Sequence, residues 1–88
     1  MDANVFNPNT APLGIDFKVD TPGQVRIIIY NIAAEIVARV LDEVKAQGSY
    51  RVHWDGKNKS GEVVGNAVYF VVIQEPSGHL VRRVIVLK

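Results

Sequence analysis

The chain has 88 residues, which is enough for one small domain and too few for two. Lys and Arg number 10 against 9 Asp and Glu, and the resulting net charge of +1 argues against a strongly basic nucleic-acid-binding protein. Hydrophobic residues make up 48% and cysteine is absent, so a globular core is expected and disulfides, thiolate metal sites and cysteine nucleophiles are excluded. No signal peptide is expected in this sequence, and no apolar run approaches the about 20 residues of a membrane span.

The chain divides into an extended N-terminal segment and a single domain. Residues 1–14 are rich in Asn, Pro and Gly, which is typical of an extended, irregular course. Residues 15–88 contain several runs in which apolar and polar residues alternate, a pattern that indicates half-buried strands. In chain order we predict strands over 15–20, 24–31, 49–54, 67–74 and 79–87, with a short edge strand at 63–64.

Turn signals recur about every 8–12 residues along the domain, which is the spacing of an all-β sandwich or barrel. Thr21-Pro22-Gly23 is one such signal and Pro76-Ser77-Gly78 is another. The inward positions of the strands define an expected core of Phe17, Val25, Ile27, Ile29, Val52, Trp54, Tyr69, Val71, Val84 and Val86.

Residues 32–47 are ambiguous by local rules. Ala33, Ile36, Val40 and other apolar residues fall at helical spacing, and Asn31 could cap such a helix. The β-branched residues of the same segment are better tolerated in a strand. Propensity alone therefore leaves helix and strand open.

No constellation of catalytic or metal-binding residues is present in the sequence. His53 and His79 fall on different predicted strands, which favours two surface histidines over a metal site. The loop that starts at Asp55 has Lys57 and Lys59 where a calcium loop needs oxygen ligands. We therefore expect no catalytic residue, no metal and no cofactor, and a protein that is not an enzyme.

Three of the predicted strands are apolar on both sides, although a strand of a two-layer sandwich has only one buried face. The outward set is either covered by loops and the N-terminal segment, or forms a docking or assembly face. The candidate docking residues are Ile28, Tyr30, Phe70, Val72, Ile85 and Leu87.

A set of motifs spread along nearly the whole chain resembles a known module. It consists of Phe6-Asn7-Pro8-Asn9-Thr10, Tyr30-Asn31, Gly48, Trp54-Asp55-Gly56, Gly61, Tyr69-Phe70 and the terminal Val86-Leu87-Lys88. This pattern resembles the immunoglobulin-like module at the C-termini of bacterial secreted proteins, including the sorting domains of the type IX secretion system. It is also similar to the immunoglobulin-like domain of the flagellar hook-capping protein.

The resemblance implies a seven-stranded antiparallel sandwich of the immunoglobulin-like or fibronectin-III-like type, located outside the cytoplasm or on the cell surface. The family usually has glycine at the place of Ala34, which leaves the turn after the second predicted strand without the residue that tolerates a positive φ. The segment length still matches the family, which favours a strand over 35–41 and allows a helical turn at 42–47.

The leading functional expectation is a non-catalytic module for secretion or surface attachment of a larger bacterial protein. Its partner would be the secretion machinery, and the resemblance implies a sorting signal in the last strand, formed by Arg82, Arg83, Val84, Ile85, Val86, Leu87 and Lys88. The alternative is an assembly module that packs on a neighbouring domain or on copies of itself. A third alternative, an accessory carbohydrate-binding domain, is weakened by the aromatic content of only 8%.

Overall fold

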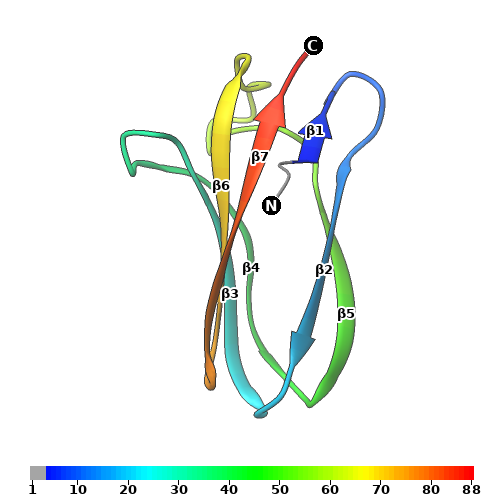
Figure 1. The fold of residues 1–88 in the computed structure, drawn as a ribbon, viewed down its shortest axis with the longest axis vertical. Coiled ribbons are helices and arrows are strands. Elements are labelled where there is room, and N and C mark those ends of the chain that lie inside the picture. The colour runs from blue at the N-terminus through cyan, green and yellow to red at the C-terminus, as the bar shows by residue number, and fades with distance from the viewer. Residues whose placement is uncertain (1–3) are drawn as a thin grey trace.

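The computed structural model describes residues 4–88, which form two facing β-sheets (Figure 1). The strands are β1 (Asn4–Phe6), β2 (Leu13–Val19), β3 (Gly23–Tyr30), β4 (Ile36–Lys45), β5 (Gly48–Trp54), β6 (Ala67–Glu75) and β7 (Gly78–Val86). One sheet has the order β1-β7-β6-β3-β4, and the other consists of β2 and β5. The predicted all-β, immunoglobulin-like sandwich is confirmed.

Neighbouring strands are antiparallel except for β1, which runs parallel to β7 with Asn4 opposite Val84 and Phe6 opposite Val86. This strand lies inside the segment 1–14, for which the sequence predicts an irregular course. Its side chain Phe6 is only 5% exposed and packs on Trp54 at 5.7 Å between ring centroids. Burial of this one aromatic ring therefore accompanies the pairing of β1 with the edge of the sheet.

The ambiguous segment folds as a turn followed by β4, and strand pairing with β3 continues to Lys45. The helical turn allowed at 42–47 does not form. Two register shifts in β4 explain the helix-like spacing of its apolar residues. Ile27 pairs with Leu41 but Ile28 pairs with Arg39, so an extra residue between them lets Ala38 and Leu41, three apart, both point into the core.

The turn between β3 and β4 is organised by Asn31. Its side-chain oxygen accepts hydrogen bonds from the backbone N–H groups of Ala33 at 2.9 Å and Glu35 at 3.0 Å. Ala34 takes a φ of 62°, in the left-handed region that favours glycine. The hydrogen bonds to the Asn31 side chain fix the shape of the turn. They hold Ala34 in this conformation although its backbone energy there is unfavourable.

The loop after β5 repeats this arrangement around Asn58. Its side-chain oxygen accepts from the backbone N–H groups of Ser60 and Glu62 at 2.9 and 3.0 Å, and Gly61 takes the positive φ of 83°. The expected edge strand at 63–64 is wrong. Val63 makes a single bridge to Lys57, because the chain turns inward to bury Val64, whose N–H donates to the carbonyl of Gly56.

The core lies between the sheets and is centred on Trp54. The indole packs on Phe6 of β1 and Tyr69 of β6, and its N–H donates to the carbonyl of Lys57 at 3.0 Å. The predicted core residues are buried with one exception, Val52, which is only partly buried because β5 belongs to the narrow two-stranded sheet. Phe6, from outside the predicted strands, and Val64, from the stretch wrongly expected to be an edge strand, also belong to the core.

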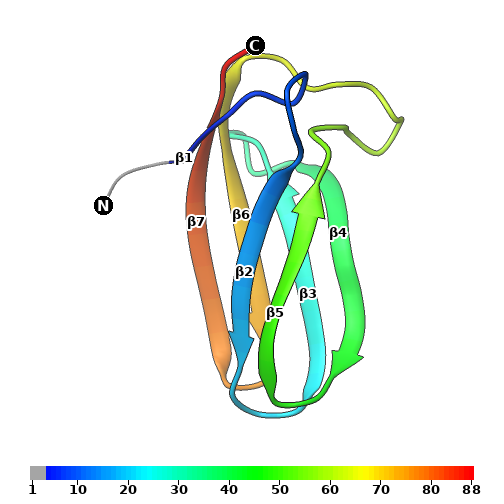
Figure 2. The ribbon, with the colours of Figure 1, turned by 90° about the vertical axis from the view of Figure 1, so that its right-hand side faces the viewer.

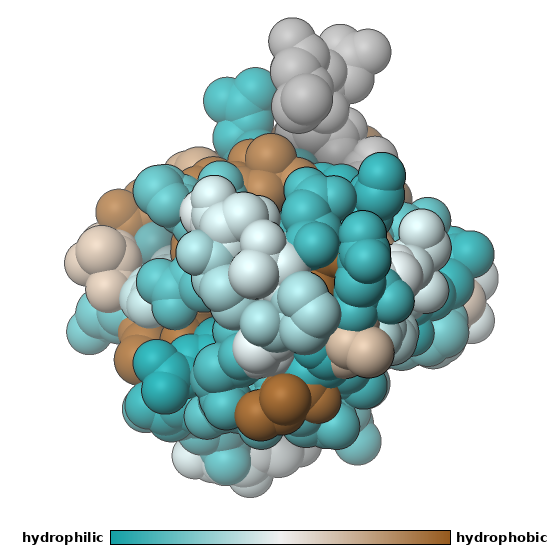
Figure 3. Space-filling model, turned by 90° about the horizontal axis from the view of Figure 1, so that it is seen from below, coloured by the Kyte–Doolittle hydropathy of each residue, from teal (hydrophilic) through white to brown (hydrophobic). Residues whose placement is uncertain are grey.

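The narrow sheet lies in front of the wide one in Figure 2. At the open side of the sandwich Arg82 joins β7 to β2. Its guanidinium donates to the carbonyl of Asp16 at 2.8 Å. At the end where the β2–β3, β4–β5 and β6–β7 turns lie, the surface is mainly hydrophilic (Figure 3). There the hydroxyl of Ser77 donates to Glu75 and lowers the pKa of that carboxyl. In residues 4–88 no helix is long and apolar enough to cross a membrane.

Replacing Ala34 by Gly should raise the free energy of unfolding by about 0.5–1 kcal/mol. A left-handed L-residue costs about 1–2 kcal/mol, and part of the gain is offset by the larger unfolded-state entropy of glycine. Urea unfolding of both proteins measures the difference. Ala33→Gly in the same turn is the control and should lower stability, as should Gly61→Ala in the matching turn. An Ala34→Gly protein less stable than the parent would contradict this account.

Candidate docking face

The outer face of the five-stranded sheet carries three adjoining rows of apolar side chains. Cross-strand pairing places Val72 between Ile28 and Val81 in the first row. In the second row Phe70 lies between Tyr30 and Arg83, and in the third Ile85 lies between Val68 and Val5. We call this surface the outer apolar face. A polar row of Asp42, Arg26, Gln74 and His79 borders it toward the turns.

The candidate docking residues are brought together here, apart from Leu87, which lies just beyond β7. Ile28, Tyr30, Phe70, Val72 and Ile85 are half-buried, because neighbouring side chains on the sheet shield one another. Sequence patterning missed Val5 and Val81, which are 64% and 49% exposed and extend the face toward its edge. Val5 was not identified because its segment has too short an alternation of apolar and polar residues to predict a strand.

The outer face of β2 and β5 is polar. Asp16 and Arg51 form an ion pair at 3.4 Å, and Lys18, Ser49 and His53 are exposed beside them. An ion pair at such an exposed site contributes little to stability, so its main effect is to keep this side solvated. The two outside surfaces of the sandwich therefore differ sharply in character.

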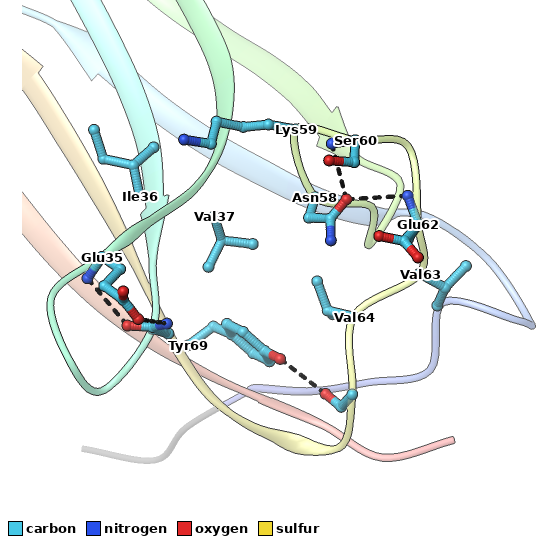
Figure 4. Close-up of a pocket in the computed structure, with 12 residues that line it drawn as sticks. Glu35, Ile36, Val37, Asn58, Lys59, Ser60, Glu62, Val63, Val64 and Tyr69 are labelled. Atoms are coloured by element: carbon cyan, nitrogen blue, oxygen red, sulfur yellow. Dashed lines mark hydrogen bonds between the residues drawn. The ribbon is translucent and has the colours of Figure 1, made fainter.

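A cleft of about 510 Å³ opens between the two asparagine-capped turns (Figure 4). Glu35 and Glu62 lie on its rim, and Val37 and Tyr69 line its interior. Burial raises the pKa of the Tyr69 hydroxyl, which donates to the carbonyl of Gly65 at 3.0 Å. The polar side chains that line the cleft mostly make hydrogen bonds within the two turns. Among residues 4–88, no three His, Asp or Glu side chains lie close enough together to hold a metal ion.

The aromatic side chains do not form a carbohydrate-binding row in the described part of the chain. Tyr30 and Phe70 are paired on the outer apolar face. Tyr50, the third candidate, stacks on Phe17 at 5.5 Å and donates its hydroxyl to the carbonyl of Ala46. Its ring also lies under the ammonium group of Lys45 at 5.1 Å, so it belongs to a local structural cluster.

Of the residues expected to carry a sorting signal, 82–86 belong to β7, and Leu87 and Lys88 follow it. Val84 and Val86 are buried in the core, and Arg82 is held by its bond to Asp16. Ile85 points to the outer apolar face. Lys88 is tied back by its N–H, which donates to the side-chain oxygen of Asn66 at 2.9 Å.

Fold and surface together define the class of protein: an immunoglobulin-like domain whose most distinctive surface is an apolar sheet face. A model of the FlgD Ig-like domain matches residues 3–79, and the chain belongs to this family. The predicted resemblance to the immunoglobulin-like domain of the flagellar hook-capping protein is thereby confirmed.

A solved structure, that of FlgD from P. aeruginosa, is similar in fold, with a TM-score of 0.67 and 18% sequence identity. The similarity covers 94% of this chain and 65% of the other, so the chain spans less than two thirds of that protein. At this identity the likeness shows the fold alone. No curated protein matches the chain significantly.

The expected role in type IX secretion or surface attachment is wrong. The family that matches is the FlgD Ig-like domain and not a sorting domain. The error arose because the shared motifs are structural: Trp54, Tyr69 and the glycine turns build the sandwich and say little about its use.

The opposite orientations of Val72 and Ile73 can be tested by truncation. Ile73→Ala should lower the free energy of unfolding by about 2–5 kcal/mol, because Ile73 is 3% exposed in the core. Val72→Ala should cost less than about 1 kcal/mol, because its side chain is only half-buried on the outer face. Chemical denaturation measures both, and equal losses would mean that the faces are wrongly assigned.

Proposed function

We propose that this domain is a non-catalytic assembly module of the flagellar hook-capping type. Membership of the FlgD Ig-like domain family supports the flagellar role, since FlgD is the hook-capping protein. The similarity in fold to FlgD of P. aeruginosa is consistent with it. The proposal includes export from the cytoplasm, because a hook is built outside the cell. It also treats residues 15–88 as the domain, with β1 docked onto it.

The observation that carries an assembly role is the difference between the two outer faces. The face of β2 and β5 is covered by charged and polar side chains, as expected for a surface in water. The outer apolar face has three rows of branched and aromatic side chains, including Tyr30 and Phe70 side by side. Contiguous apolar surface of this kind is typical of protein–protein contacts, and aromatic residues are enriched at their centres.

A non-catalytic role also agrees with the chemistry of the described side chains. Four of the acidic side chains among residues 4–88 pair with nearby bases, as in Arg26 with Asp42 and Arg51 with Asp16. We therefore assign the domain to contacts with other protein subunits, made by the outer apolar face.

Immunogold microscopy of the organism that encodes the chain tests this proposal. An epitope-tagged protein should label the distal ends of growing hooks. Phe70→Asp should abolish the label while protein levels stay normal, because a carboxylate in the centre of the face blocks docking. His53→Asp places the same charge on the polar face and should leave labelling intact.

Two results would contradict the proposal. Label spread over the surface of cells without hooks would exclude a hook-capping role. Hook label retained in Phe70→Asp would show that the contacts are made elsewhere on the domain.

A further inference from the structure

Two arginines flank the outer apolar face on opposite sides. Arg39 of β4 pairs across the sheet with Ile28, and Arg83 of β7 pairs with Phe70. Both side chains are exposed. Three strand spacings from β4 to β7 place them about 14 Å apart across the sheet, with the apolar side chains of β3 and β6 between them and Val81 and Ile85 beside Arg83 on β7.

Arg26, the third arginine of this surface, is already neutralised. Its Nε lies 3.2 Å from a carboxylate oxygen of Asp42, which is also bound by the side-chain amide of Gln24. Within residues 4–88 neither Arg39 nor Arg83 makes an ion pair. The face therefore offers an apolar centre with two arginines at its sides that make no ion pair among residues 4–88, although the chain as a whole is nearly neutral.

Because the outer apolar face is small, the charges beside it determine whether a contact on it is stable. The apolar rows span about 20 Å along and across the strands, or about 400 Å², roughly half the area that each partner contributes to a stable interface. An apolar contact of this size is weak, and like charges brought together at its rim cost enough to prevent it. A second copy of this chain would double the excess of arginine at the contact.

We propose that Arg39 and Arg83 make the outer apolar face selective. They keep a second copy of the chain from packing on it, and they recruit a different protein surface with an apolar centre and carboxylates at its rim. Guanidinium groups suit this task, because each can bind a carboxylate through two parallel hydrogen bonds. This inference rests on the proposed contact role of the face and adds the chemistry of its partner.

Sedimentation equilibrium of the purified chain and its charge variants tests the inference. The wild type should be monomeric at high micromolar concentration. The neutral variant R39Q/R83Q should form a dimer at least about tenfold tighter than any wild-type association. The matched control K18Q/R51Q removes two positive charges from the polar face and should remain monomeric.

The acidic variant R39E/R83E supplies a defined partner of the proposed chemistry. Mixed with the wild type it should form a heterodimer, while neither protein self-associates alone. Raising the salt from about 50 to about 500 mM should weaken this heterodimer, because exposed charges are screened. All substituted positions are exposed, so circular dichroism and melting should match the wild type.

The inference is overturned if R39Q/R83Q stays monomeric, if the wild type dimerises as tightly as that variant, or if no heterodimer forms. Adding Phe70→Asp to R39Q/R83Q separates this failure from that of the proposed function. Loss of the dimer in the triple variant supports the outer apolar face as the contact. A dimer that survives Phe70→Asp would show that the face is not used, and would remove the basis of both proposals.

Discussion

Strict alternation of side chains along a strand is the constraint on which this structure depends. β3, β6 and β7 are apolar at nearly every position of their central parts, yet the sandwich has a single core. Val25, Ile27, Ile29, Val71 and Val84 point inward and are almost completely buried. The residues between them must point outward, and none of the strands described in residues 4–88 forms a second layer over them. The outer apolar face follows directly from this alternation.

The second sheet of the sandwich contains few strands. Two strands, β2 and β5, cover a sheet of five, and side chains from β1, β7 and the loop after β5 complete the packing. Phe6 and Val64 pack around Trp54 at one end, and Arg82 spans the open side by reaching the backbone of β2. Because these side chains come from β1, a loop and the last strand, the first and last strands are integral to the fold.

Most of the fold could be predicted from the sequence, because alternation and turn residues act locally. β4 could not, since its two bulges replace alternation by a spacing that imitates a helix, and only pairing with β3 decides the outcome. The positive φ of Ala34 could not be predicted from the sequence either, because it depends on the hydrogen bonds to the Asn31 side chain. Five of the candidate docking residues lie together on one face. The sequence motifs could not distinguish hook capping from secretion, because they are residues that build the sandwich shared by both families and do not contact a particular partner.

The central claim is that the outer apolar face is the contact surface of an assembly domain. NMR of methyl groups in the presence of a soluble paramagnetic chelate tests it most directly, in the isolated chain and in the chain assembled with its partner subunits. The account predicts that Ile28, Val72 and Ile85 methyl signals broaden in the isolated chain and are protected in the assembly, while Ala11 and Ala46, exposed away from this face, broaden in both. Equal broadening of the face methyls in both states would contradict it.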